Sequence, residues 1–88
     1  MASRTVAIVN RRGLHARASA KFVTLASARK AEIEVEKDGS SVCGTSIMGL
    51  MMLGAAMGDS ITIHAEGEGA DDSLQQLVSL VEDRFGED

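Results

Sequence analysis

The feature that most limits the fold of this chain is a strict alternation of charged and apolar residues over 32–36, Glu-Ile-Glu-Val-Glu. A two-residue period predicts a strand with one apolar face and one face in water. Asp38-Gly39 follows, a strong hairpin signal, and leads into a second strand over 40–43. Residues 60–65 alternate in the same way. A sheet with one wet face needs helices on the other, which predicts an α+β fold of two layers.

The N-terminal third predicts one strand and one helix. The strand covers residues 5–9 and ends at Asn10, before the Arg11-Arg12-Gly13 loop. The helix covers residues 16–28 and places Arg17, Lys21 and Thr24 on its exposed side. Its apolar stripe is expected to comprise Ala16, Ala20, Phe22, Val23 and Ala26.

A last helix is predicted after Gly67-Glu68-Gly69, with Asp71 and Asp72 in its first turn, where carboxylates complement the helix dipole. Its buried stripe is expected to comprise Leu74, Leu77, Val78 and Val81. Two such helices on a mostly antiparallel sheet of four strands account for one domain over residues 1–88.

His15 stands where the first helix is expected to begin. The first backbone N–H groups of a helix, here those of Ala16 and Arg17, have no intrahelical acceptor and form an anion site. A neutral imidazole is a competent nucleophile, and a phosphoryl group on it would meet these amides and the Arg17 guanidinium. Gly13 permits a tight turn just before it. The spacing equally fits a histidine that only caps the helix beside a solvated arginine.

Positive charge is concentrated in residues 1–30, which contain no acidic residue although the chain has a net charge of −4. This third is expected to attract an anion or an acidic partner surface around His15. Alternatively, basic residues merely avoid the acidic last helix. A nucleic-acid partner is disfavoured because Phe22 and Phe85 are the only aromatic residues. The seven basic residues are Arg4, Arg11, Arg12, Arg17, Lys21, Arg29 and Lys30.

Residues 46–53, Ser-Ile-Met-Gly-Leu-Met-Met-Leu, are apolar almost all round. A short helix here cannot bury every side chain, so Ile47, Met48 and Met51 are candidates for an exposed docking surface, although an ordinary core helix remains the alternative. Ser46 fits the N-cap of this helix. Phosphorylation there would add about two negative charges beside the apolar surface.

Several other classes of site are not expected. Cys43 has no partner for a disulfide and is predicted to be a buried thiol. His64 is predicted to point outward from its strand, and the two histidines lack metal-ligand spacing. We therefore expect no metal and no cofactor. No apolar run is long enough to span a bilayer, which predicts a cytoplasmic protein without membrane insertion.

Two motifs resemble the HPr family, the histidine-containing phosphocarriers of the bacterial phosphotransferase system. These are Gly13-Leu14-His15-Ala16-Arg17 and, thirty-one residues after the histidine, Ser46-Ile47-Met48-Gly49, followed by Leu53-Gly54. The resemblance covers essentially the whole chain. It implies an open-faced β-sandwich, in which four antiparallel strands carry three helices on one face.

The resemblance also implies roles for individual residues. His15 would accept a phosphoryl group on Nδ1 from enzyme I and pass it to an enzyme IIA domain, with Arg17 neutralising the phosphate. Ser46 would be phosphorylated by HPr kinase/phosphorylase, beside a docking surface of Ile47, Met48 and Met51. Such a chain is an exposed relay and a monomer rather than a self-contained enzyme. A module that acts only through its Ser46 face is the alternative.

One residue departs from the family pattern. Ala18 stands where the family usually has proline, which would pre-set the first helical turn. Phosphoryl acceptance is expected to survive this change. The continuation Arg-Ala-Ser-Ala-Lys-Phe over residues 17–22 is similar to carriers of the nitrogen-related regulatory branch.

Overall fold

The computed structural model describes residues 2–87, which form four strands, three α-helices and a short 3-10 turn. Met1 and Asp88, the ends of the predicted domain, lie outside these residues. The order of the elements and the antiparallel pairing follow the sequence prediction. In chain order the elements are β1 (Ala2–Ala7), α1 (Ala16–Ser27), β2 (Glu32–Lys37), β3 (Ser40–Cys43), α2 (Ile47–Met52), β4 (Ser60–Glu66), α3 (Ala70–Glu82) and the 3-10 turn η1 (Arg84–Gly86).

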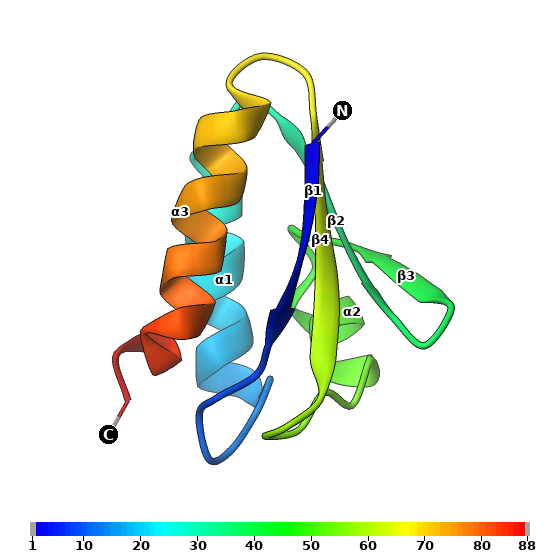
Figure 1. Ribbon diagram of the computed structural model, residues 1–88, viewed down its shortest axis with the longest axis vertical. Helices are drawn as coiled ribbons and strands as arrows, with labels where there is room; N and C mark the ends of the chain where they lie inside the picture. The colour runs from blue at the N-terminus through cyan, green and yellow to red at the C-terminus, as the bar shows by residue number, and fades with distance from the viewer. Residues whose placement is uncertain (1, 88) are drawn as a thin grey trace.

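The strands form one antiparallel sheet in the order β1-β4-β2-β3 (Figure 1). Ile33 lies opposite Ala65 and Val35 opposite Ile63, and all four are buried, while the glutamates between them on β2 face away. The alternation therefore predicted the wet and dry faces correctly. Asp38-Gly39 forms the expected hairpin between β2 and β3.

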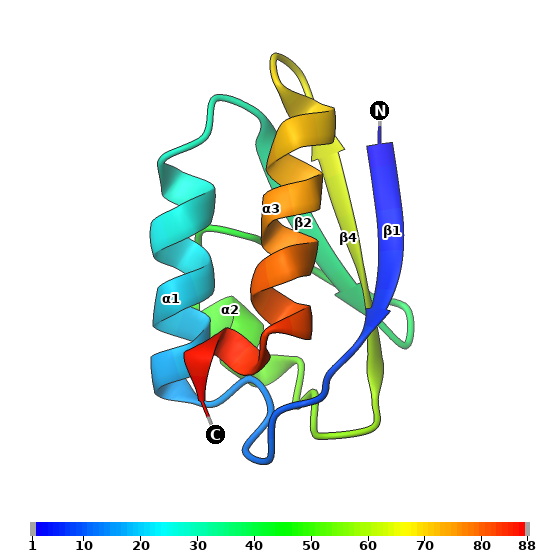
Figure 2. The same cartoon turned by 60° about the vertical axis from the view of Figure 1, so that its left-hand side comes forward.

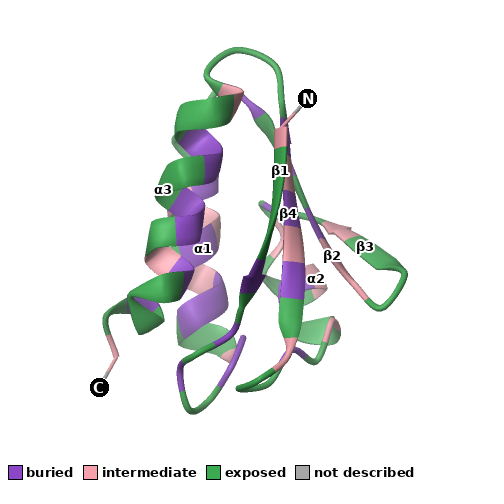
Figure 3. Ribbon diagram, in the orientation of Figure 1, coloured by how far each residue is buried: buried purple, intermediate pink, exposed green. Residues whose placement is uncertain are grey.

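The three helices complete a two-layer α+β fold around a single core, as predicted. α1 and α3 lie side by side over the sheet, while the shorter α2 contacts α1 and β3 (Figure 2). The sides of α1 and α3 that face each other and the sheet are buried (Figure 3). In residues 2–87, no helix combines the length and hydropathy needed to cross a bilayer.

The bounds of β1 and the buried face of α1 differ from the sequence prediction. β1 covers Ala2–Ala7 rather than residues 5–9, because β4 pairs with it from Ala2 opposite Ala65 onward. Its first half is exposed at an edge of the sheet and so lacks the apolar pattern of a strand. On α1 the predicted stripe was misplaced by part of a turn: Ala16 is exposed, whereas Ala18 and Ser19 are buried beside Phe22.

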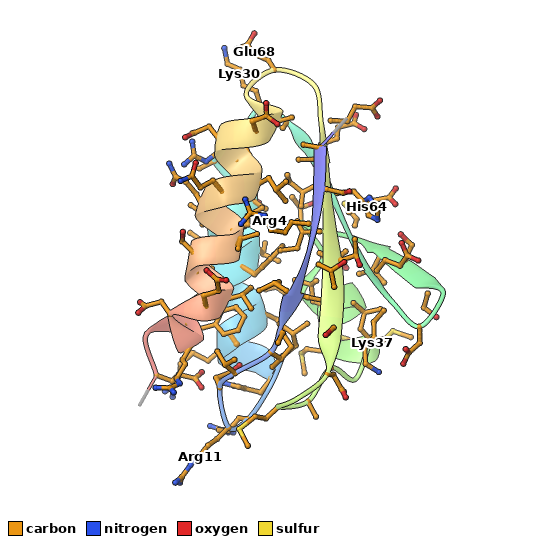
Figure 4. All side chains as sticks on the ribbon, viewed as in Figure 1. Arg4, Arg11, Lys30, Lys37, His64 and Glu68 are labelled. Atoms are coloured by element: carbon orange, nitrogen blue, oxygen red, sulfur yellow. The ribbon has the colours of Figure 1, made fainter. Side chains whose placement is uncertain are left out.

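The prediction of a buried Cys43 thiol was wrong. β3 is a short edge strand, and Cys43 lies opposite Glu34 on the uncovered face of the sheet, where its side chain is exposed. Its Sγ lies 3.0 Å from Thr45 Oγ1, and this hydrogen bond lowers the pKa of the thiol. His64 points outward as predicted, away from the helices (Figure 4). Its Nε2 lies 3.0 Å from Glu36 Oε1, a cross-strand partner that the sequence did not indicate.

Candidate functional site

His15 is the N-cap of α1, as the sequence predicted. Its backbone is extended, with φ −74° and ψ −179°, and its carbonyl accepts the Ser19 N–H at 2.9 Å. The Arg17 N–H donates to Nδ1 of the ring at 3.3 Å. The imidazole therefore lies across the open end of the helix, where peptide hydrogens and the positive end of the helix dipole favour an anion.

The loop before His15 depends on Gly13. This residue has φ +63°, and a Cβ placed on it would lie 2.3 Å from the Ala55 carbonyl oxygen. The next residue, Leu14, donates its N–H to that same oxygen at 3.0 Å. Because the loop rests directly on the chain after α2, the start of α1 is fixed relative to the Ser46 helix.

The His15 ring is less open than the sequence predicted. Its Nε2 is hydrogen-bonded to a carboxylate oxygen of Glu87, near the C-terminus of the chain, and only 14% of the His15 side chain is exposed. The other Glu87 oxygen accepts a hydrogen bond of 3.1 Å from Nδ2 of Asn10, which is fully buried. The hydrogen bond to His15, and then that from Asn10, lower the pKa of the Glu87 carboxyl, while its partial burial opposes them.

A short C-terminal turn places Glu87 at the ring, and sequence reasoning missed it. Arg84 and Phe85 adopt positive φ values of 57° and 55°, a conformation that costs free energy in residues with a side chain. Complete burial of Phe85 offsets this cost, and Lys21 Nζ donates to the Phe85 carbonyl at 2.6 Å. The only signal for this turn in the sequence was an aromatic residue, Phe85, followed by Gly86.

Positive charge gathers around His15 less completely than expected. Arg17 is exposed on the first turn of α1, as predicted, and Arg11 lies at the same end of the molecule as the start of that helix (Figure 4). Lys30, however, lies at the opposite end, where it pairs with Glu68 at 3.2 Å. Arg29 likewise pairs with Asp72 on α3. The local attraction for an anion is therefore provided by only part of the basic third.

Ser46 is the N-cap of α2, as predicted, and its Oγ accepts the Gly49 N–H at 3.0 Å. Beyond it, Leu50 is buried in the core, whereas the expected docking residues are exposed: Ile47 by 40%, Met48 by 68% and Met51 by 40%. Met52, in the same helix, and Met57, in the loop after it, are exposed as well. Among residues 2–87, no three His, Cys, Asp or Glu side chains are grouped so that they could hold a metal ion.

Comparisons with known proteins agree with this geometry. Residues 2–83 match the family model described as the PTS HPr component phosphorylation site. A phosphocarrier protein HPr of Neisseria meningitidis is 45% identical over 99% of this chain and 98% of its own length. A phosphocarrier protein NPr of Shewanella violacea is 40% identical over 96% of the chain and 92% of its own length.

Solved structures give the same result. An HPr from Thermoanaerobacter tengcongensis superposes with a TM-score of 0.96 and 43% identity, over 100% of this chain and 99% of that one. An HPr dimer from the same organism has a TM-score of 0.78 and 44% identity, over 99% of this chain and 100% of that one. These similarities cover the His15 and Ser46 segments together.

Proposed function

This chain belongs to the HPr family of phosphocarriers of the phosphotransferase system, and we propose that His15 is the residue that carries its phosphoryl group. The hydrogen bond between the Arg17 N–H and Nδ1 of His15 supports this assignment most directly. It puts one ring nitrogen at the start of α1, on whose first turn Arg17 is exposed. His64, by contrast, lies on a strand and pairs with Glu36.

The proposed reaction is a relay between proteins. Phosphorylated enzyme I would present its phosphoryl group in line with the Nδ1 lone pair, and an enzyme IIA domain would later remove it. The backbone amides of Ala16 and Arg17 and the Arg17 guanidinium would compensate the charge of the phosphate. Modest stabilisation suits a carrier, because tight retention would oppose onward transfer.

Ser46 is the proposed regulatory site, phosphorylated by HPr kinase/phosphorylase. Its hydroxyl already caps α2, so a phosphate on it would be compatible with the start of the helix and would add negative charge next to Ile47, Met48 and Met51. These three side chains are the proposed docking surface for partner proteins. Negative charge beside them would weaken the binding of an acidic partner.

We further propose that residues 1–88 act as one cytoplasmic domain and as a monomer. The shared core of α1, α3 and the sheet supports the single domain. The HPr dimer from Thermoanaerobacter tengcongensis offers the opposite possibility for the oligomeric state. Light scattering after size-exclusion chromatography measures this directly, and a mass of twice 9.2 kDa would contradict the monomer.

The test of the proposed function is phosphorylation with enzyme I and phosphoenolpyruvate, followed by intact-mass measurement. The wild-type chain is expected to gain one acid-labile phosphoryl group. The variant His15→Ala is expected to gain none, whereas the matched variant His64→Ala retains the gain. No incorporation into the wild-type chain, or incorporation that survives in His15→Ala, would contradict the proposal.

A further inference from the structure

One nitrogen of the His15 ring faces a hydrogen-bond donor, and the other faces an acceptor. Nδ1 faces the Arg17 N–H, which can only donate a hydrogen bond, so Nδ1 must offer its lone pair. Nε2 faces the Glu87 carboxylate, which in its ionised form can only accept. The two contacts therefore select the same neutral tautomer, with the proton on Nε2 and the lone pair on Nδ1.

Glu87 is held at the ring by a buried asparagine and by the anchored C-terminal turn. Buried Asn10, in the loop after β1, donates to Glu87 Oε1 at 3.1 Å and to the Gly13 carbonyl at 2.8 Å. The same asparagine therefore ties the carboxylate to the turn that leads into His15. Two residues before Glu87, Phe85 is fully buried and its carbonyl accepts a hydrogen bond from Lys21 Nζ. Asn10 and the buried C-terminal turn therefore together hold the Glu87 carboxylate at the ring.

We propose that Glu87 is a positioning residue which keeps the proton of the His15 ring on Nε2 throughout the phosphoryl-transfer cycle. This inference rests on the proposed phosphorylation of His15. In the unphosphorylated chain, Glu87 leaves Nδ1 as the nucleophile. In the phosphorylated chain, Glu87 is the counter-ion of a ring that carries a phosphoryl group on Nδ1 and a proton on Nε2.

The transfer balances without any movement of the Nε2 proton. The Nδ1 lone pair forms a bond to phosphorus, and the bond from phosphorus to the donor breaks with its electron pair going to the donor. The ring then carries one positive charge, which lies against the Glu87 carboxylate. In the onward step the N–P bond breaks, its electron pair returns to Nδ1, and a neutral imidazole leaves. Without the Nε2 proton the leaving group would be an imidazolate, a much poorer one.

The tautomer can be tested on the unphosphorylated chain. The ring ¹⁵N chemical shifts of His15 are compared in the wild type, Glu87→Ala and Glu82→Ala at a pH where the ring is neutral. Glu82→Ala is the matched control, because it removes an exposed carboxylate at the end of α3 that is not hydrogen-bonded to His15. Loss of a hydrogen bond to a charged group is expected to lower the ratio of Nε2–H to Nδ1–H tautomer about tenfold in Glu87→Ala. The control is expected to match the wild type.

The second arm uses the phosphorylated chain. The wild type and Glu82→Ala are expected to transfer the phosphoryl group onward faster at neutral pH than Glu87→Ala. Equal ¹⁵N shifts in the wild type and Glu87→Ala would overturn the proposal, whether or not His15 is phosphorylated. A changed tautomer in a chain that accepts no phosphoryl group would contradict the proposed function and leave the role of Glu87 in selecting the tautomer established.

Discussion

The starts of α1 and α2 are both capped by a side chain, yet the two caps are built differently. Ser46 caps α2 through a contact three residues along the chain, and the side chains around it are exposed methionines and an isoleucine. His15 caps α1, and its ring is also held by Glu87, seventy-two residues away. Glu87 in turn depends on buried Asn10. The Ser46 cap is therefore local, whereas the His15 site is assembled from both ends of the chain.

This difference fits the two proposed roles. A histidine that takes and gives up a phosphoryl group needs a defined tautomer, which requires fixed partners on both nitrogens. A serine that is modified by a kinase needs no fixed partner elsewhere in the chain, and the cap contact of Ser46 lies within the first turn of α2. The Leu14 N–H, just before His15, donates to the carbonyl of Ala55, in the chain after α2. This hydrogen bond fixes the two sites relative to each other.

The largest expected effect comes from the C-terminal turn. Phe85→Ala removes a fully buried ring and is expected to lower the free energy of unfolding by about 3–5 kcal/mol. It should also release Glu87 from His15 while leaving the Ser46 cap intact. Urea denaturation measures the stability, and the chemical shift of the Gly49 amide reports the cap. Met52→Ala, at a side chain 79% exposed, is the control and should change stability by less than about 0.5 kcal/mol.

The contact between the loop before His15 and the chain after α2 is tested by two glycines with almost equal φ angles. Gly54→Ala, at φ +66° in open space, is expected to cost only the left-handed conformation, about 1–2 kcal/mol. Gly13→Ala, at φ +63°, also drives a Cβ into the Ala55 carbonyl and should cost about 1–3 kcal/mol more. Thermal denaturation compares the two. Equal losses of stability would show that the loop before His15 does not rest on the chain after α2.

The local cap is expected to have a smaller effect. Ser46→Ala should lower the free energy of unfolding by about 1 kcal/mol, because the Gly49 N–H loses its acceptor. Ser46→Asp keeps a capping oxygen and should stay within about 0.5 kcal/mol of the wild type while adding a negative charge. Chemical denaturation gives the stabilities, and the rate of phosphorylation by enzyme I gives the effect of charge. Equal rates in Ser46→Asp and the wild type would argue against the regulatory role.

The smallest expected effect is a pH dependence of the contact at His15. The folded-state pKa of the Glu87 carboxyl lies below its ordinary value of 4.5, because His15 and then Asn10 donate hydrogen bonds to it. The contact therefore stabilises the fold at pH values above 4.5 and is lost as the pH falls through the folded-state value. The wild type and Glu87→Ala should differ most in stability above this range and converge in acid. A difference that grows as the pH falls below 4.5 would contradict this assignment.

Sequence alone predicted those parts of the molecule that are set by local pattern. The alternation around Ile33 and Val35, the hairpin at Asp38-Gly39 and the apolar stripe of α3 were all correct, because each follows from spacing along one element. The N-cap positions of His15 and Ser46 were correct for the same reason.

The errors and omissions have two sources, spacing or register within a local element, as on α1 and β3, and contacts between distant segments. Cys43 is exposed because the register of the Asp38-Gly39 hairpin places it opposite Glu34 on the uncovered face of the sheet, an indication that the sequence prediction overlooked. Glu87 was missed because a glutamate near a chain terminus has no local signal, and its contact with His15 exists only after Phe85 is buried.

The most direct measurement is NMR of the ¹⁵N-histidine-labelled chain after phosphorylation by enzyme I. The account predicts coupling between ³¹P and Nδ1 of His15, with a proton on Nε2 and unchanged resonances for His64. A phosphoryl group on Nε2 of His15, or on His64, would contradict it.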